Sequence, residues 1–520
     1  MTDPAWIHRV DALVGGPRLA VKDNVDVAGM PTTCAHPAYG YVPEVSSPAV
    51  QRLVDDGCVV VGKTNLDQFA TGLVGTRSPY GAVPNPYVPD RIAGGSSSGS
   101  AVVIVTGEAD LAIGTDTAGS GRVPAALCGI VGLKPTVDLI STDGVVPACA
   151  SLDCVSIFAP TVRSAAAALA TMAGGPRPVP VGTPVAPLGP LRIGVPRDDD
   201  LVLLDGPARS AWERAVKELE GLGSLVTLDL SPYLEAGQLV YGAAFLPERF
   251  AAVGAFLAEH PEGADPTVAQ IIAQGGRIDA ASSSRDRARL LGLRDQVAGW
   301  WRAVDVVVVP TVGEAPTFDE VAADPIGVNL RLGTYTAGAN PLDLCAAAVP
   351  CGWRDDGVPF GVTFLGPAFA DPVVAVAGAR LVGEPDPPPP SWVGWTDLFV
   401  VGAHLTGQPL NHQLVDRGGH LVRANVTAPT YRLVALPTSP PKPGLVRVLD
   451  GGAQVRGEVW RLPTDGFGSF VAAIPSPLGI GTVALADDTE VPGFLCEAYA
   501  AEGAPDITEY GGWLAYLRAR

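Results

Sequence analysis

The chain has 520 residues, of which 47% are hydrophobic and 17% charged, and its formal net charge is −19. This apolar content is enough for a sizeable core and excludes an intrinsically disordered protein, while the length predicts two or three domains, or one large domain with an appendage. The acidic charge, without any Lys/Arg-rich run, argues against nucleic acid as a partner.

The sequence also lacks targeting and metal-binding signals. The N-terminus has no charged segment followed by an apolar one, and no apolar run reaches 18 residues. We therefore expect a cytoplasmic protein without a membrane partner. The eight cysteines are scattered, without CxxC pairs or His/Cys clusters at zinc spacing. We expect them to be reduced and packed in the interior, with no metal site.

The elements in chain order predict an α/β fold. Residues 1–174 are dense in glycine, and a strand-like segment, Ala112–Thr117, leads through a glycine turn to a helix that is expected to begin just after Ser120. The later elements are a Pro/Val/Gly-rich surface connection at 175–190, a strand at 191–196, helices at 207–222 and 286–302, and a buried strand at 306–309. Buried strands alternating with helices are typical of α/β proteins.

The clearest domain boundary is the segment 384–390, which contains four consecutive prolines. Such a run favours polyproline II, a stiff spacer that cannot continue a helix or a central strand. We expect a first domain at 1–383, a Pro-rich linker at 384–395 and a compact β-rich domain at 396–520. The expected strands of the second domain are 398–402, 421–425, 431–436, 445–449 and 457–462.

Three motifs in the first domain contain residue types suited to nucleophilic attack on an amide. They are Ala20-Val21-Lys22-Asp23-Asn24, Gly94-Gly95-Ser96-Ser97-Ser98-Gly99-Ser100 and Asp116-Thr117-Ala118-Gly119-Ser120-Gly121-Arg122. Amide hydrolysis needs a nucleophile, a base that later protonates the leaving nitrogen, and donors for the oxyanion. Ser120 is the predicted nucleophile, because its flanking glycines allow a sharp turn and close approach of a substrate. The predicted oxyanion hole consists of the N–H groups of Thr117, Ala118, Gly119 and Ser120.

The predicted base is a lysine. Of the six histidines, only His8, His36 and His260 precede the linker, and each has a polar or terminal context. Lys22 ends an apolar strand-like stretch, and burial can lower a lysine pKa from about 10.4 toward neutrality. Ser96 would then relay the proton from Ser120 to Lys22. Taken singly, the three motifs are also compatible with a solvated lysine, a flexible loop and a helix N-cap.

The segment from Arg18 to about Thr136, ending in Gly132-Leu133-Lys134-Pro135-Thr136, resembles the amidase signature family. The resemblance implies an α/β fold with a mixed, mostly parallel central sheet covered by helices. It also implies a Ser-Ser-Lys triad of Ser120, Ser96 and Lys22, with a cis peptide bond at Ser96. The family usually has several dozen residues before its lysine, including helices that cover the core and can form a dimer contact, whereas Lys22 has 21. We expect a homodimer, and either a start further upstream or a naturally short N-terminus.

Within that family, several strings resemble those of allophanate hydrolases. The strings are 63–72, 74–81, 119–124, 331–336 and 340–344, and beyond the linker 398–405, 410–414 and 466–470. Gly121 stands where most relatives have a larger residue, which makes it a candidate for substrate binding. The last three strings imply the domain fused behind the amidase in those enzymes, a β-rich domain with a γ-glutamylcyclotransferase-like fold.

This resemblance implies hydrolysis of allophanate, the carboxylate of urea, to ammonia and CO2 by way of N-carboxycarbamate. The reaction would pass through a covalent acyl-enzyme on Ser120 and needs no cofactor. The substrate would come from a separate urea carboxylase or from a biuret-producing pathway. The alternatives are another amide hydrolase of the same family, acting on aliphatic or aryl amides, and an interaction protein built on an inactive amidase core.

A substrate carboxylate favours an arginine fork as its partner. Arg287 and Arg331 are the main candidates, and Arg285 and Arg289 lie on the same helical stretch as Arg287, for which a solvated helix face is the alternative. Tyr335 is a candidate hydrogen-bond donor, whereas Arg122 is expected to be structural.

The second domain contains two candidate histidines. His404 and His412 lie near glycine turns in the part that resembles a cyclotransferase-like pocket, so either could assist decarboxylation of N-carboxycarbamate. The alternative is that both are structural. Glu458 is a weaker candidate, expected to be a strand residue facing solvent.

Overall fold

A computed structural model describes residues 3–10, 15–180, 183, 190–390, 392 and 394–519. The chain divides into two compact units. The first comprises Met1–Val179 and Gly189–Trp392, and the second Pro180–Leu188 and Val393–Arg520.

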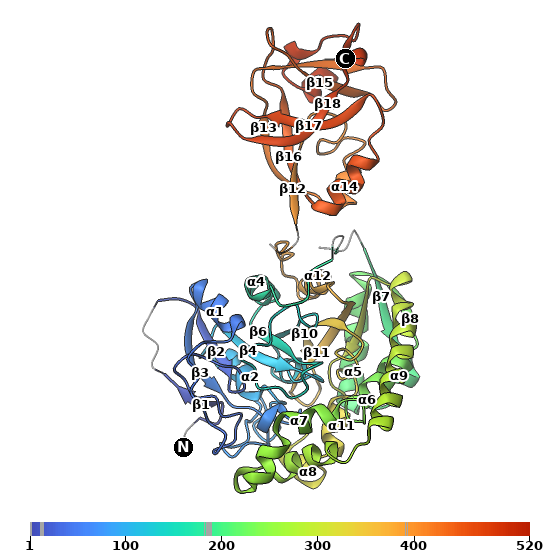
Figure 1. Cartoon of the computed structure of the whole chain (residues 1–520). Helices are drawn as coiled ribbons and strands as arrows, with labels where there is room; N and C mark the ends of the chain where they lie inside the picture. Colours follow the sequence, from blue (N-terminus) through green and yellow to red (C-terminus); the bar gives the residue numbers. More distant parts are fainter. Residues whose placement is uncertain are drawn as a thin grey trace. The chain divides into compact units, whose positions relative to one another are not determined.

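The first unit is built around a mixed sheet, which has eleven strands among the described residues (Figure 1). From one edge to the other the strands are β1 (Trp6–Arg9), β3 (Val59–Thr64), β2 (Arg18–Lys22), β4 (Leu111–Asp116), β6 (Cys154–Ala159), β5 (Val131–Lys134), β10 (Leu344–Trp353), β11 (Pro359–Pro367), β9 (Val306–Pro310), β7 (Leu191–Pro196) and β8 (Gly223–Leu228). The strands expected at 191–196 and 306–309 are β7 and β9.

The sheet is mixed as expected, but its expected parallel majority is wrong. Among the described strands, four neighbouring pairs are parallel: β3–β2, β2–β4, β9–β7 and β7–β8. The other six neighbouring pairs, which include the whole centre of the sheet, are antiparallel. The short connection between β10 and β11 allows only an antiparallel pair, whereas the parallel pair β7–β8 is joined by a crossover helix.

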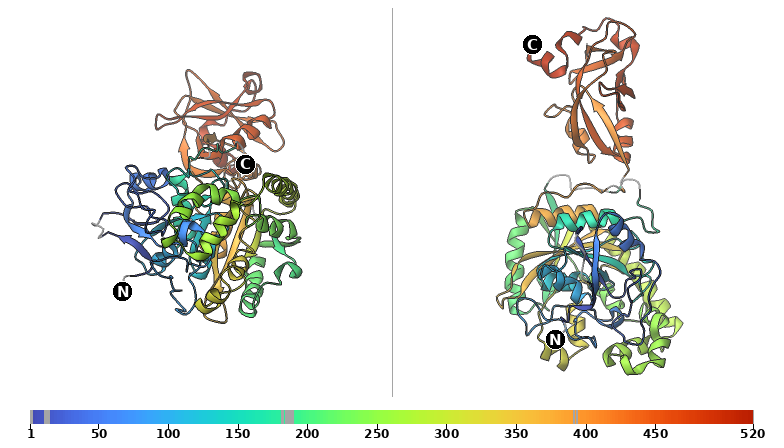
Figure 2. Two further views of the ribbon diagram at one scale, coloured as in Figure 1. Left: turned by 60° about the horizontal axis from the view of Figure 1, so that its bottom comes forward. Right: turned by 90° about the vertical axis from the view of Figure 1, so that its left-hand side faces the viewer.

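Helices cover both faces of this sheet (Figure 2). On β4 and β6, alternate side chains belong to different apolar clusters. Ile113 and Ile157 share a cluster with α4 (Val162–Met172) and α12 (Asp371–Leu381), and Ala112 and Phe158 share one with α2 (Ser98–Val105). This period of two is what a sheet between two helical layers requires. The helices are α1 (Pro48–Asp55), α2 (Ser98–Val105), α3 (Arg122–Leu127), α4 (Val162–Met172), α5 (Gly206–Glu220), α6 (Ser231–Leu239), α7 (Leu246–Glu259), α8 (Pro266–Gly275), α9 (Ala280–Ala298), α10 (Phe318–Ala323), α11 (Gly327–Leu332) and α12 (Asp371–Leu381). Helices α5 and α9 correspond to the two expected at 207–222 and 286–302. In the part of the chain that the structure describes, no helix has the length and apolarity needed to cross a membrane.

The second unit is β-rich, as expected. Its described strands form a five-stranded sheet in the order β13-β16-β12-β18-β17 and a separate pair, β14-β15. The strands are β12 (Trp395–Val400), β13 (His420–Val426), β14 (Tyr431–Leu436), β15 (Lys442–Arg447), β16 (Arg456–Pro463), β17 (Leu478–Ala484) and β18 (Glu490–Cys496), and the helices are α13 (His412–Val415), α14 (Thr464–Ala472), α15 (Ala498–Ala501) and α16 (Trp513–Arg518). The five expected strands are β12–β16. Strands β17 and β18 escaped prediction, because glycines at 479 and 481 in β17 and Pro492-Gly493 in β18 weaken their strand patterns.

The turn that holds Ser96 is packed against the loop at 71–77. The N–H of Gly95 donates to the Leu73 carbonyl at 2.8 Å. Gly75 has a left-handed φ of +70°, and a Cβ built on it would lie 2.5 Å from the Gly94 carbonyl oxygen. The close approach of the two loops therefore depends on a glycine at position 75.

Two glycine-to-alanine variants separate this contact from backbone strain alone. Gly107 has the same φ of +70°, but a Cβ there has nothing within 4 Å. Gly107→Ala should lower the free energy of unfolding by about 1–2 kcal/mol, the cost of a left-handed alanine. Gly75→Ala should cost more, because it adds the clash with Gly94, and this difference should appear in chemical denaturation of the two variants. Equal losses of stability would contradict the packing described here.

Candidate active site

The three predicted motifs meet at the carboxyl ends of the neighbouring strands β2 and β4 of the first unit's sheet. Lys22 is the last residue of β2, and Ser120 lies in the turn between β4 and α3. Strands β2 and β4 are parallel neighbours, so their carboxyl ends point to the same edge. Ser96 is in the turn before α2, which packs against both strands.

Lys22 is completely buried and contacts Ser96. Its Nζ lies 2.7 Å from Ser96 Oγ and 2.8 Å from Thr115 Oγ1. Burial lowers the pKa of Lys22 to about 7, although the negative charges of Asp67, Asp153 and Asp116 partly oppose this shift. The expected burial and its effect on the lysine are therefore present in the structure.

Ser96 and Ser120 are held close to each other by backbone contacts. The Gly95–Ser96 peptide bond is cis, as the family resemblance implied. The N–H of Ser97, next to Ser96, donates to the Ser120 carbonyl at 3.3 Å. Ser120 Oγ lies 3.4 Å from the Gly72 carbonyl oxygen, and Ser120 lines a cavity of about 230 Å³.

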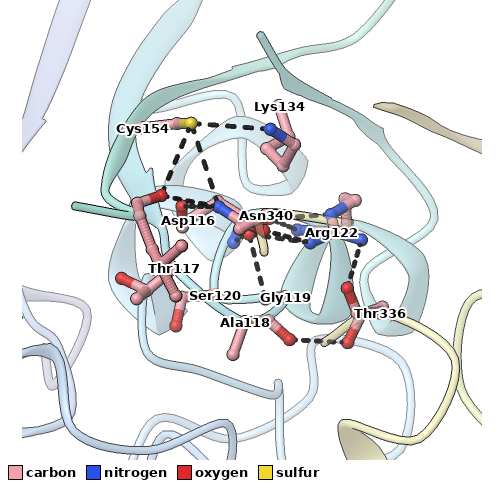
Figure 3. A network of polar contacts seen from close by, with 12 residues as sticks. Asp116, Thr117, Ala118, Gly119, Ser120, Arg122, Lys134, Cys154, Thr336 and Asn340 are labelled. Atoms are coloured by element: carbon pink, nitrogen blue, oxygen red, sulfur yellow. Dashed lines mark hydrogen bonds and ion pairs between the residues drawn. The ribbon is translucent and has the colours of Figure 1, made fainter. Parts of the chain in front are cut away.

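A buried ion pair supports the turn that carries Ser120 (Figure 3). The Arg122 guanidinium binds both carboxylate oxygens of Asp116, through Nη2 at 2.8 Å and Nε at 2.9 Å, and neither side chain is exposed. Burial by itself would raise the pKa of Asp116, but the Arg122 charge and the backbone N–H groups outweigh it, so the pKa is lowered. Arg122 is thus structural, as expected: it shapes the turn and does not line the cavity.

The N–H groups of this turn are not equivalent. The N–H of Gly119 donates to Asp116 Oδ1 at 2.9 Å, so Gly119 is wrongly included among the predicted oxyanion donors. For the N–H groups of Thr117, Ala118 and Ser120, the described residues provide no acceptor. These three groups remain available to a bound oxygen atom.

The cavity beside Ser120 contains a buried arginine that the sequence reasoning missed. Arg249, on α7, is 5% exposed and makes no hydrogen bond or ion pair with any described residue. A second buried arginine, Arg77, donates to the carbonyl oxygens of Thr71 and Pro325. Tyr241 also lines the cavity, and its hydroxyl has no partner among the described residues. Arg249 therefore brings positive charge to the cavity without an ion pair to any carboxylate that the structure describes, although Asp153 is near enough to attract it.

The arginines predicted to bind substrate are elsewhere. Arg287 pairs with Glu248 at 2.7 Å, and Arg331 pairs with Glu314 at 3.0 Å and with Asp324 at 3.2 Å. Arg285 donates to Ser282, and Arg289 pairs with Glu235. None of the four lines the cavity at Ser120. Acidic residues hold Arg287, Arg289 and Arg331 at the surface, and Arg285 bonds to Ser282 on its own helix.

The other two predicted substrate-binding residues are also outside the cavity. The Tyr335 hydroxyl is buried and donates to the Asp200 carbonyl at 3.3 Å. A Cβ on Gly121 would meet Ser156 at 2.7 Å, so this position faces the interior. Its small size serves packing of the turn against β6 and not contact with a ligand.

One sequence signal could have identified Arg249. The buried positions of α7 include Leu246, Arg249, Val253 and Leu257, at the spacing of one helix face. A charged residue within an otherwise apolar stripe is costly unless it meets a ligand or an opposite charge. The position of Arg249 within the apolar stripe of α7 was therefore a better indication of a ligand-binding role than its positive charge.

In the second unit the two candidate histidines differ sharply. His404 is 8% exposed, is stacked on Phe494 with ring centroids 5.0 Å apart, and lies 3.1 Å from Gln413 Oε1 through Nε2. Burial lowers the pKa of His404 to about 4. His412 is exposed, with Nδ1 2.9 Å from the Pro409 carbonyl oxygen.

Glu458, the weaker candidate of the second unit, is not a free surface residue. It is half-buried and accepts hydrogen bonds from the Thr406 N–H at 2.9 Å and from Trp460 Nε1 at 2.9 Å. Across both units, the described residues contain no group of three His, Cys, Asp or Glu side chains arranged to hold a metal ion.

Solved structures resemble this chain over nearly its whole length. A serine-to-alanine variant of the allophanate hydrolase of Kluyveromyces lactis matches with a TM-score of 0.91 and 38% identity, covering 99% of this chain and 93% of that one. The urea amidolyase of the same organism matches with a TM-score of 0.90 and 38% identity, covering 99% of this chain and 34% of that one.

Sequence comparisons agree with this result. The urea amidolyase of Lachancea kluyveri is 40% identical over 99% of this chain, which spans 31% of that protein, so the chain covers about a third of this curated relative. The model of the allophanate hydrolase C-terminal domain matches residues 396–518, and the Amidase model matches residues 8–374. Because the match to the Amidase model covers well over half of this chain, the chain belongs to the amidase family.

Proposed function

We propose that this protein hydrolyses allophanate, the carboxylate of urea. The observation that carries the proposal is the buried, unpaired guanidinium of Arg249 in the cavity next to Ser120. A cavity with an unpaired guanidinium favours an anionic amide over the neutral aliphatic and aryl amides. The allophanate hydrolase of Kluyveromyces lactis and the urea amidolyases, which resemble this chain, support the same choice.

The proposed first step uses Lys22, Ser96 and Ser120. Neutral Lys22 accepts a proton from Ser96 as Ser96 accepts one from Ser120, and Ser120 Oγ attacks the terminal ureido carbonyl. A lysine with a pKa of about 7 has a substantial neutral fraction at neutral pH, which this role requires. The 2.7 Å contact between Lys22 and Ser96 is short enough for direct proton transfer.

The oxyanion that forms is proposed to bind in the loop 116–120, which we call the oxyanion loop. Its available donors are the N–H groups of Thr117, Ala118 and Ser120. The proton taken up by Lys22 returns through Ser96 to the leaving nitrogen, and ammonia departs. Water then hydrolyses the acyl-enzyme to N-carboxycarbamate. This product loses CO2 to give carbamate, which breaks down to a second ammonia and a second CO2.

Recognition of the substrate carboxylate is proposed to rest on Arg249. The net charge of −19 repels an anion at long range, so a local cation is needed at the site. Arg77 adds a second positive charge while holding the loop at Thr71. We propose that the Tyr241 hydroxyl, which has no partner among the described residues, donates to the same ligand.

The second unit is proposed to act on N-carboxycarbamate through His404. With a pKa of about 4, the imidazole of His404 is neutral at physiological pH, so it would hydrogen-bond to the product and not pair with it as a cation. The exposed His412 has no comparable enclosed environment. We propose residues 384–395 as the linker between a catalytic domain at 1–383 and this domain at 396–520. We also propose that the protein is a cytoplasmic homodimer. Its substrate would come from a urea carboxylase or a biuret-producing enzyme.

The first test is ammonia released per allophanate consumed near pH 8, against a blank without enzyme because allophanate decomposes spontaneously. The full chain should release two ammonia per substrate. Ser120→Ala should lose all release above the blank, because no other group supplies the nucleophile. Acetamide and benzamide serve as neutral comparison substrates, and their preferred hydrolysis would contradict the proposed substrate.

The role of Arg249 predicts a defect in binding. Arg249→Met should raise KM for allophanate about 10- to 100-fold, since a hydrogen bond to a charged group contributes about 1.5–3 kcal/mol. Arg289→Met is the matched control, because Arg289 is an exposed arginine paired with Glu235. Steady-state kinetics of the two variants should show a KM change only for Arg249→Met, and equal KM values would remove Arg249 from recognition.

A further inference from the structure

The segment that follows α11 contributes two buried side chains to the oxyanion loop. Thr336 Oγ1 donates to the Ala118 carbonyl at 2.8 Å, and Asn340 Nδ2 donates to the Asp116 carbonyl at 2.8 Å. Both side chains lie against the loop in Figure 3, although more than 200 residues separate them from Ser120. Neither lines the cavity, so neither contacts a substrate bound there.

The peptide unit between Ala118 and Gly119 is held at both ends. Its carbonyl accepts from Thr336, and its N–H donates to Asp116 Oδ1 at 2.9 Å. In a trans peptide these two groups point in opposite directions, so two hydrogen bonds fix the rotation of the plane. Arg122 completes the arrangement, because it binds Asp116 and also donates to the Thr336 carbonyl at 2.8 Å.

This central plane sets the directions of its neighbours. The N–H of Ala118 belongs to the peptide unit before the Ala118–Gly119 unit, and the N–H of Ser120 belongs to the unit after it. In this later unit, the Gly119 carbonyl accepts from the Val123 N–H at 2.8 Å. A rotation of the Ala118–Gly119 plane would therefore turn one or both proposed oxyanion donors. Gly119 permits this contact, because a Cβ there would lie 2.2 Å from Thr336 Oγ1.

We propose that Thr336 is a positioning residue that fixes the oxyanion donors through the Ala118 carbonyl. The inference rests on the proposed function and deepens it by giving a role to the segment 331–336. The hydroxyl acts on the transition state only, since the donors are needed most when the oxyanion forms. Loss of the hydroxyl should lower kcat and leave substrate binding unchanged.

The test compares three variants of the full chain in the ammonia assay, which are Thr336→Val, Thr336→Ser and a control variant. Thr336→Val keeps the shape and removes the hydroxyl, whereas Thr336→Ser keeps the hydroxyl. Loss of one oxyanion donor typically costs about 10²–10³ in rate, so a misdirected donor in Thr336→Val should lower kcat about 10- to 100-fold, with KM within about twofold. Thr336→Ser should retain most of the wild-type kcat.

The matched control is Thr363→Val on β11. Thr363 is also fully buried, and its hydroxyl bonds to Thr311 Oγ1 at 2.9 Å, so this variant measures the cost of removing a buried hydroxyl elsewhere in the same unit. Thr363→Val should keep the wild-type kcat. If Thr336→Val does not fold, Thr336→Ala replaces it, with folding checked by the unfolding midpoint.

Two outcomes would overturn the inference. One is a wild-type kcat in folded Thr336→Val, and the other is an equal loss of kcat in Thr336→Ser, which would show that the hydroxyl is not responsible. The wild-type chain in the same assay distinguishes a failure of the positioning role of Thr336 from a failure of the proposed function. Hydrolysis of allophanate by the wild type with no effect of Thr336→Val removes only the positioning role.

Discussion

The arrangement of the candidate active site depends on the burial of one lysine. Lys22 is fully enclosed at the end of β2, and removing its ammonium group from water is what brings its pKa to about 7. Three buried carboxylates near it, those of Asp67, Asp153 and Asp116, oppose the shift without cancelling it. The proposed base is thus a consequence of packing: a water-filled gap at this point would restore an ordinary ammonium group.

The same carboxylates shape the loops around Lys22. Asp67 accepts hydrogen bonds from the N–H groups of Val74 and Gly75, and Asp116 accepts them from those of Gly119 and Gly121. Asp153 accepts a hydrogen bond from Thr117 Oγ1 at 2.5 Å. Each charge that acts on the lysine therefore also fixes a loop that lines the cavity or carries Ser120, and we infer that position and protonation state are set together.

Sequence motifs were sufficient for the residues at strand ends and tight turns, but not for pairings between distant segments. Lys22, Ser96 and Ser120 are recognisable because small residues and an adjacent apolar strand determine their surroundings locally. The helical spacing of Arg249 was a usable local signal, but the position of Arg331 outside the cavity depends on its pairing with Glu314 and Asp324. The antiparallel pairing of the central strands likewise depends on which segments become neighbours. These are tertiary choices that a local pattern does not contain.

The most direct test of the account is the titration of Lys22 itself. The chain has five lysines, so ¹³C-labelled lysine gives few NMR signals, and Lys22→Met identifies the one that belongs to Lys22. We predict a midpoint near 7 in the folded protein, with Lys22 protonated below this pH and neutral above it. A midpoint close to the ordinary lysine value of about 10.4 would contradict it, because Lys22 would then be an ammonium ion at neutral pH and could not accept the proton from Ser96.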